Sequence, residues 1–235
     1  MKVCVIGGAG YVGLITGLCL SEIGHHVINM DVDHERICQL QAGNCYVHEE
    51  GIEPLLRRNL DLGRFNFSTN LPSAVETCDI VFIAVGTPSQ EDGQADLSQF
   101  KTVGEELGRS IAGYKVFVIK STVPAGAVEL LRTILGRKNR EGEDFDIVVN
   151  PEFLREGKGL HDFFYPDRIV IGARSHKAMA VIRALYEPII QGEVPRLDGR
   201  PGPLKSTPVP LVETDPSSAQ MIKYASNAFL ATQIS

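Results

Sequence analysis

Gly8-Ala9-Gly10-Tyr11-Val12-Gly13 is the stretch that decides the fold. It follows a short apolar run, Val3–Ile6, and opens an amphipathic stretch, Tyr11–Ile23. A GxGxxG spacing between a strand and a helix is typical of a dinucleotide-binding turn. We expect Gly8 to permit the tight turn, Gly10 to let a pyrophosphate approach the backbone, and Gly13 to let the helix pack on the strand. Because the first turn of a helix offers free N–H groups to phosphates, the predicted cofactor-binding residues here are Gly8, Gly10, Tyr11, Val12 and Gly13.

An acidic residue ends the next predicted strand. Asp31 follows His26–Met30 at an offset of about 20 residues from the glycines, where dinucleotide-binding folds place a ribose-binding carboxylate. A carboxylate accepts hydrogen bonds from the ribose hydroxyls and repels a 2′-phosphate, so NAD is the predicted cofactor. Arg36 lies slightly further on, and it either reaches the adenosine side or is an ordinary surface arginine.

Apolar runs alternate with helical patterns along most of the chain. The predicted strands are Val3–Ile6, His26–Met30, Asp79–Val85, Lys115–Lys120, Asp146–Val149 and Arg168–Ile171. The predicted helices are Tyr11–Ile23, Glu35–Ala42, Gly51–Leu62, Leu97–Ile111, Gly126–Leu135 and His176–Tyr186. This alternation predicts an α/β fold with a doubly wound, mostly parallel, Rossmann-like sheet.

The last part of the chain breaks this alternation. Gly192–Pro210 is rich in Gly and Pro and is predicted to be a long loop. Thr214-Asp215-Pro216 then predicts a helix start, and no stop signal follows it, so we expect the chain to end inside a long helix. We therefore predict two parts: a Rossmann-like domain over residues 1–212, and the start of the long helix over residues 213–235.

Two threonines follow the ends of predicted strands. Thr87 comes after Asp79–Val85, and Thr122 comes after Lys115–Lys120. Ligands of open α/β sheets lie beyond the carboxyl ends of the strands, so both threonines are predicted to meet the cofactor. Thr is equally suited to be a helix N-cap, and the two interpretations stay open together.

Two further pairs carry chemistry at a spacing of four. Glu152 and Glu156 follow a strand end, and such a pair, if helical, shares a face and suits acid–base work. The alternative is an exposed turn with an ion pair of Arg155. Lys223 and Asn227 on the last predicted helix would stabilise a developing oxyanion, or would be a surface lysine and a mid-helix asparagine.

Composition narrows the class of protein. The formal net charge of −6 argues against a nucleic-acid partner, which favours a basic surface. No apolar run reaches about 18 residues, so no membrane span is predicted. The five cysteines form no CxxC pair, which indicates reduced thiols in a cytoplasmic protein without a metal site.

Taken together, the motifs resemble those of the UDP-glucose and GDP-mannose dehydrogenases, and they occur in that family's order over essentially the whole chain. The matching stretches are Gly8-Ala9-Gly10-Tyr11-Val12-Gly13, Val85-Gly86-Thr87-Pro88, Lys120-Ser121-Thr122-Val123-Pro124, Asn150-Pro151-Glu152-Phe153-Leu154-Arg155-Glu156, Tyr165-Pro166-Asp167-Arg168 and Lys223-Tyr224-Ala225-Ser226-Asn227-Ala228-Phe229.

The resemblance implies oxidation of the C6 alcohol of a UDP-sugar to a carboxylate in two steps, with two NAD per sugar. A cysteine captures the aldehyde, a second hydride transfer gives a thioester, and water hydrolyses it. Carried over to this sequence, Thr122 holds a catalytic water, Glu156 acts in hydrolysis and also contacts NAD, and Glu152 lies near the substrate. Lys223 and Asn227 stabilise the oxyanion at C6. The resemblance also implies polysaccharide biosynthesis, and a homodimer formed through the long central helix in the full-length enzyme.

The sequence departs from the family pattern in places. The family's nucleophile lies in a glycine-rich Cys-Pro-Lys-Asp stretch, whereas no cysteine here follows Cys78. We therefore expect this chain to be the NAD-binding half, without turnover of its own. His48-Glu49-Glu50-Gly51 replaces the family's Glu-Pro-Gly. The alternatives are a GDP-mannose or UDP-N-acetylhexosamine dehydrogenase, and a non-catalytic NAD-binding module.

Overall fold

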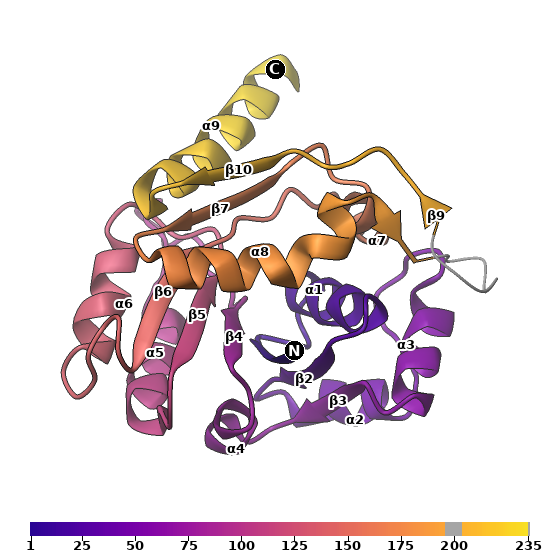
Figure 1. The fold of residues 1–235 in the computed structure, drawn as a ribbon, viewed down its shortest axis with the longest axis horizontal. Helices are drawn as coiled ribbons and strands as arrows, with labels where there is room; N and C mark the ends of the chain where they lie inside the picture. Colours follow the sequence, from indigo (N-terminus) through magenta and orange to yellow (C-terminus); the bar gives the residue numbers. More distant parts are fainter. Residues whose placement is uncertain (196–203, 235) are drawn as a thin grey trace.

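One eight-stranded sheet organises the chain, in the order β10-β7-β6-β5-β4-β1-β2-β3 (Figure 1). The structure, a computed structural model, describes residues 1–195 and 204–234. Neighbouring strands are parallel except β6 and β7, which pair antiparallel. The predicted α/β fold with a doubly wound, mostly parallel sheet is confirmed. The strands are β1 (Lys2–Ile6), β2 (His26–Met30), β3 (Phe65–Ser68), β4 (Ile80–Ile83), β5 (Lys115–Ile119), β6 (Phe145–Val149), β7 (Ile169–Ala173) and β10 (Leu211–Thr214).

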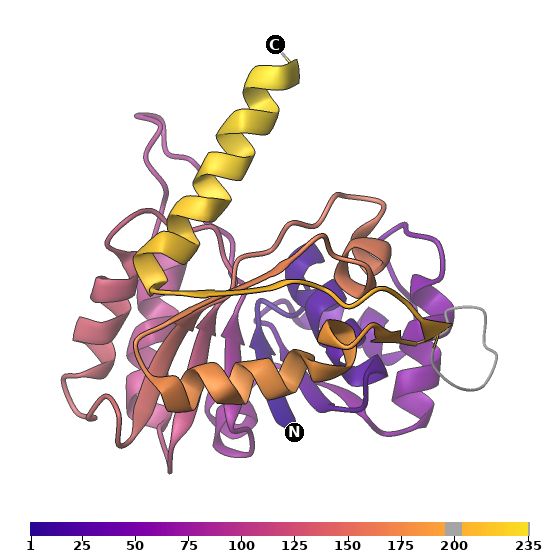
Figure 2. The same ribbon diagram turned by 45° about the horizontal axis from the view of Figure 1, so that its top comes forward.

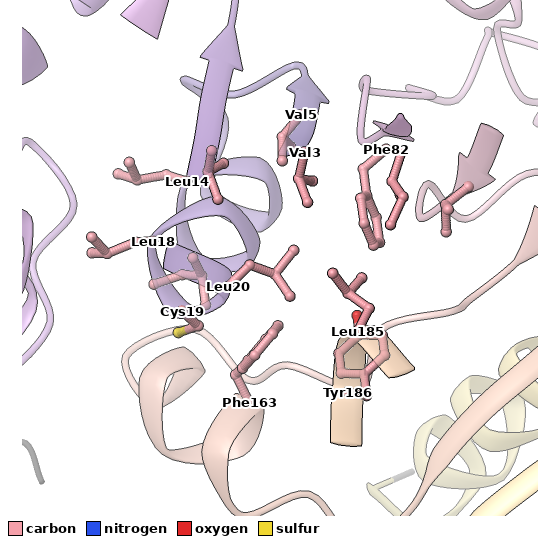
Figure 3. Packing of buried hydrophobic residues seen from close by; sticks show 14 of the residues in the cluster. Val3, Val5, Leu14, Leu18, Cys19, Leu20, Phe82, Phe163, Leu185 and Tyr186 are labelled. Atoms are coloured by element: carbon pink, nitrogen blue, oxygen red, sulfur yellow. The ribbon is translucent and has the colours of Figure 1, made fainter. Parts of the chain in front are cut away.

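Helices cover both faces of the sheet, because its central strands are apolar on both sides. In β1, Val3 and Val5 face one layer while Cys4 and Ile6 face the other, as the two-residue period of a strand requires. Figure 3 shows the first of these layers, where side chains of β1 and α1 gather with Phe163, Leu185 and Tyr186 of the later helices. On this face lie α1 (Tyr11–Glu22), α2 (His34–Gln41), α3 (Ile52–Asp61), α7 (Gly159–Phe164) and α8 (His176–Ile190). On the other face lie α4 (Leu71–Glu76), α5 (Ser98–Ser110), α6 (Ala127–Leu135) and the start of α9 (Pro216–Ile234).

The strand order creates a natural place for a ligand. From β1 the chain winds outward through β2 to β3, then returns to β4 on the other side of β1 and winds outward again through β5 and β6. The loops after β1 and β4 therefore leave in opposite directions. Ligands of open α/β sheets bind in the crevice at such a switch point, beyond the carboxyl ends of the strands.

The six predicted strands and six predicted helices are all present. The sequence analysis missed short elements and one sheet edge, and it ended one helix too early: α8 continues from Tyr186 to Ile190 and includes Pro188. The missed elements are β3, α4, α7 and β10.

The predicted Gly192–Pro210 loop needs a correction, since its described part contains two short strands. β8 (Glu193–Val194) and β9 (Leu204–Lys205) pair antiparallel, while residues 196–203 lie outside the described residues. A helix begins at Pro216, as predicted.

Helix α9 starts on the sheet and projects away from the body of the molecule (Figures 1 and 2). Gly172 of β7 permits the close start, because a Cβ at this position would lie 2.5 Å from the Cβ of Ala219. The first turns of α9 are thereby held over the carboxyl edge of the sheet.

Candidate functional site

The turn after β1 places main-chain groups instead of side chains at the switch point of the sheet. Gly7 has the left-handed φ of 78°, so it makes the tight turn that was assigned to Gly8. That assignment was wrong: Gly8 is required for a different reason, because a Cβ there would lie 2.6 Å from the Cβ of Asn29 on β2. At Gly13 a Cβ would lie 2.1 Å from the Gly7 carbonyl oxygen, which confirms the expected close packing of α1 on the turn.

A cleft of about 440 Å³ opens at this turn, between the ends of β1, β2 and β4 (hereafter the cofactor cleft). Gly10, Asp31 and Arg36 line it, together with Val85 and Gly86 after β4.

The polar groups of the cofactor cleft fit an anionic dinucleotide. The first N–H groups of α1, at Tyr11 and Val12, have no acceptor within the helix, and they carry the positive end of its dipole. The Asp31 carboxylate accepts hydrogen bonds from the backbone N–H groups of Ala9 (2.9 Å) and Asp33 (3.1 Å), which fix it at the mouth of the cleft. Backbone donors for phosphates and an oriented carboxylate for a ribose are thus placed as NAD requires.

Arg36 lies beside the cleft without entering the turn. Its side chain is exposed, pairs with Asp33 at 3.2 Å, and lies 5.3 Å from the ring centroid of Tyr46. This position is compatible with stacking on an adenine, so the role of Arg36 stays a prediction.

Thr87 and Thr122 join the loops after β4 and β5. The Thr87 hydroxyl donates to the Thr122 backbone carbonyl at 2.8 Å. Neither residue is a helix N-cap: those positions before α5 and α6 are Leu97 and Gly126. The capping interpretation was therefore wrong, while the proposed contact with the cofactor stays a prediction.

A buried ion pair joins the loop after β6 to α9. Lys223 Nζ donates to Glu152 Oε1 at 2.7 Å, and the two side chains are only 9% and 13% exposed. The other carboxylate oxygen of Glu152 accepts from the Leu154 N–H at 2.7 Å. Phe153 lies against the pair, with its ring centroid 5.4 Å from Lys223 Nζ. Two features that the sequence shows separately thus form one cluster, and Lys223 is not a surface lysine.

The two predicted carboxylates do not share a helical face. The stretch from Asn150 to Lys158 (hereafter the carboxylate loop) is irregular, and α7 begins only at Gly159. Glu156 is exposed, and it has no hydrogen bond or ion pair within residues 1–195 and 204–234. Asn227 is likewise exposed on α9, one turn beyond Lys223. The structure therefore brings together Glu152 and Lys223, and leaves Glu156 and Asn227 at the rim.

Lys120 is a further residue of this cluster that the sequence analysis did not assign. Its side chain is buried, and Nζ donates to Asn150 Oδ1 at 3.0 Å. Tyr186 donates to the same oxygen at 2.8 Å. Burial lowers the pKa of Lys120 to about 8, against the attraction of Glu152. A charged residue at the end of an otherwise apolar strand was the signal that could have identified it.

The cysteines offer no activated nucleophile among the described residues. All five are free thiols. Burial raises the pKa of Cys4, Cys19 and Cys78, so these groups stay protonated and inert. Among residues 1–195 and 204–234, no helix combines the length with the hydropathy that a membrane span requires.

Comparisons with known proteins agree with this geometry. The family model described as UDP-glucose/GDP-mannose dehydrogenase family, NAD binding domain, matches residues 1–190. UDP-glucose 6-dehydrogenase TuaD of Bacillus subtilis is 41% identical over all of this chain and 47% of its own length. UDP-glucose 6-dehydrogenase of Pseudomonas aeruginosa is 40% identical over all of this chain and 49% of its own.

Solved structures give the same picture. A UDP-glucose dehydrogenase from Pyrobaculum islandicum superposes with a TM-score of 0.85 at 36% identity, over 98% of this chain and 50% of that one. A GDP-mannose dehydrogenase from Pseudomonas aeruginosa superposes with a TM-score of 0.87 at 31% identity, over all of this chain and 51% of that one. The chain thus spans about half the length of the relatives that it matches.

Proposed function

Because the chain belongs to the UDP-glucose/GDP-mannose dehydrogenase family, we propose that it is the NAD-binding half of a UDP-glucose 6-dehydrogenase. The observation that carries this proposal is the buried pair of Glu152 and Lys223 at the carboxyl edge of the sheet. A cofactor cleft alone has no need of it, and a buried ion pair stabilises a fold little compared with apolar packing. The pair therefore supports a catalytic role over a non-catalytic NAD-binding module.

We further propose that the NAD-binding domain extends to about residue 212 and that the central helix follows it, beginning at Pro216 as α9. Strand β10 and the start of α9 lie at this transition. Four large apolar side chains of α9 are exposed, those of Met221, Tyr224, Phe229 and Leu230, which supports a homodimer formed along this helix in the full-length enzyme.

The proposed role of the cofactor cleft is to hold NAD, which accepts hydride from the sugar carbon. Gly10 keeps a side chain away from the pyrophosphate, and Asp31 binds the adenosine ribose. Gly8 and Gly13 shape the same turn by allowing close packing on Asn29 and on the Gly7 carbonyl. Repulsion between the Asp31 carboxylate and a 2′-phosphate selects NAD over NADP.

At the substrate side, Lys223 supplies a positive charge to the oxygen that becomes negative at C6, and Asn227 supplies a neutral donor. Glu152 holds the Lys223 ammonium in one position, at 2.7 Å. We assign a catalytic water to Thr122 and hydrolysis of the acyl intermediate to Glu156, whose exposed carboxylate is free to act as a base.

We assign the UDP-glucose branch because the two relatives above carry that name, although the GDP-mannose dehydrogenase is equally close in fold. A nucleotide-linked uronic acid is an activated glycosyl donor, which supports a role in polysaccharide biosynthesis. The five free thiols support a cytoplasmic location.

The test is a calorimetric titration of this chain with NAD, with NADP as the comparator. Saturable NAD binding with much weaker NADP binding is expected. Preference for NADP, or no binding of either, would overturn the assignment of the cleft. In a second assay we expect no steady NADH formation from NAD and UDP-glucose by residues 1–235 alone, since their thiols do not supply the nucleophile.

A further inference from the structure

The hydroxyl of Tyr11 links the cofactor cleft to the carboxylate loop. Tyr11 is the first residue of α1, so its backbone N–H belongs to the turn that is proposed to receive the pyrophosphate. Its side chain extends to the carboxylate loop. The hydroxyl accepts from the Gly159 N–H at 3.1 Å, and its proton lies between Glu49 Oε2 at 3.0 Å and the Arg155 carbonyl oxygen at 2.9 Å.

These partners flank Glu156, one of the predicted catalytic residues. Glu156 lies between Arg155 and Gly159, and its own side chain has no partner in the part of the chain that the structure describes. Tyr11 therefore fixes the backbone on both sides of Glu156. A Cβ on Gly159 would lie 2.6 Å from the Tyr11 hydroxyl, so the contact requires glycine there.

Glu49 completes the link from the segment between α2 and α3. One of its carboxylate oxygens accepts from Tyr11, and the other accepts from the Leu160 N–H at 2.5 Å. The same segment contacts the glycine turn itself, where the Tyr46 hydroxyl donates to the Ala9 carbonyl. Burial and the hydrogen bond to Glu49 raise the pKa of Tyr11 to about 12, so the hydroxyl keeps its proton at neutral pH.

A second clamp closes the loop on its far side. Arg155 makes a two-pronged ion pair with Asp162 of α7, at 2.6 and 2.9 Å. The Arg155 backbone N–H also donates to Asp162, at 2.9 Å. This pair attaches the loop to α7, which follows it in the chain, and not to the first turn of α1. The attachment to the cofactor cleft therefore depends on Tyr11 and Glu49.

We propose that Glu49 is a positioning residue for the dehydrogenase reaction: through Tyr11 it fixes the segment Arg155–Gly159, and with it Glu156, against the first turn of α1. This role rests on the proposed function of Glu156. Because Tyr11 shares its backbone with the phosphate-binding turn, NAD binding and ordering of the carboxylate loop stabilise each other. Such coupling is reciprocal: the factor by which bound NAD stabilises the ordered loop is the factor by which the ordered loop strengthens NAD binding.

The experiment measures amide hydrogen exchange in this chain, with and without saturating NAD, together with the NAD dissociation constant. The amides to follow are those of Arg155, Lys158, Gly159 and Leu160, each of which has a hydrogen-bond acceptor in the structure. Glu49→Ala removes the carboxylate, and Tyr11→Phe removes only the hydroxyl. Glu50→Ala is the matched control, because Glu50 is the exposed neighbour of Glu49 in the same segment.

In the wild type, NAD should slow exchange of these amides. In both variants exchange without NAD should be faster by about tenfold, and it should no longer respond to NAD. The NAD dissociation constant should rise about fivefold. The control should behave as the wild type, and circular dichroism checks that each variant folds.

The outcomes separate this proposal from the proposed function. If NAD does not bind to the wild type, the cofactor assignment fails, while the exchange rates without NAD still decide whether Glu49 holds the loop. If NAD binds normally and the variants exchange like Glu50→Ala, the positioning role is refuted. If the variants loosen the loop but leave its NAD response intact, the coupling through Tyr11 is refuted.

Discussion

Replacing Lys120 by Met should change how the stability of this chain depends on pH. Lys120 Nζ is buried, with Asn150 Oδ1 as its hydrogen-bond acceptor and Glu152 as the nearby opposite charge. Burial lowers the pKa of Lys120 to about 8 in the folded chain, whereas an unfolded lysine has a pKa of about 10.4. Met has a similar length and no charge, so the substitution isolates the titration.

The sign and size of this change in the free energy of unfolding follow from the lowered pKa of Lys120. Between about pH 8 and pH 10.4 the unfolded chain holds the proton and the folded chain does not, so the free energy of unfolding rises with pH. The slope is at most about 1.4 kcal/mol per pH unit and the total is about 3 kcal/mol. Other groups oppose this rise, since burial raises the pKa of Cys4 and Cys19 and the unfolded chain then loses those protons first. The pH dependence of the wild type's free energy of unfolding therefore does not isolate the titration of Lys120. The difference in this free energy between the wild type and the variant does isolate it.

The assay is urea unfolding at pH values from about 7 to about 10, where small domains unfold in a transition that gives a free energy by linear extrapolation. The free energy of unfolding of the wild type minus that of Lys120→Met should rise across this pH range by most of the 3 kcal/mol. Such values carry a precision of about 1 kcal/mol. Lys101→Met on the exposed face of α5 is the control and should give a flat difference. A flat difference for Lys120 would refute the reasoning, because it would mean that the ammonium is solvated or fully compensated.

Three further changes test the site. Asp31→Asn should weaken NAD binding about tenfold and narrow the gap between NAD and NADP in calorimetry. Gly13→Ala should destabilise the chain by about 3 kcal/mol or more in urea unfolding, because its Cβ would lie 2.1 Å from a carbonyl oxygen, and should abolish NAD binding. Gly108→Ala, whose Cβ would have neighbours no closer than 3.7 Å, should be neutral or stabilising and serves as the control. Lys223→Met should cost about 3 kcal/mol by leaving Glu152 buried without its partner, and adding Glu152→Gln should recover part of this loss; an unchanged urea midpoint for Lys223→Met would contradict the pairing.

The fold could be predicted because the long elements carry strong periodic patterns. Strand β1 is apolar on both faces and leads directly into the glycine motif, so its place in a covered parallel sheet follows from local sequence. Strand β3 (Phe65–Ser68) has a mixed pattern of four residues and is defined by pairing with β2. Strand β10 follows a Pro-rich stretch, and its place beside β7 depends on contacts that no local pattern records.

Candidate residues for the site could be named from the sequence, but their arrangement in space could not. The family resemblance pointed to Glu152, Glu156, Lys223 and Asn227 as candidates, yet the pairing of Glu152 with Lys223 spans 71 positions and depends on where α9 meets the sheet. The spacing of four wrongly suggested a shared helical face for Glu152 and Glu156, because the backbone after β6 is held by side-chain contacts instead of helical bonds. Glu49 was not predicted for the same reason, because its proposed role depends on a tertiary contact with Tyr11.

The local charge of the site also explains how an acidic chain could bind the anionic substrate that we propose. The chain as a whole carries a formal charge of −6. Around the end of β6, however, Asp162 is neutralised by Arg155, and Glu152 faces two lysines, Lys223 and Lys120. Below the pKa of Lys120 the group of Glu152, Lys223 and Lys120 keeps one net positive charge in a largely buried setting, where charges act more strongly than in water. The positive charge of Lys120 thus balances the negative charge of Glu152, so that the charge of Lys223 remains available to the oxyanion that we propose. Loss of the Lys120 proton above about pH 8 removes this balance.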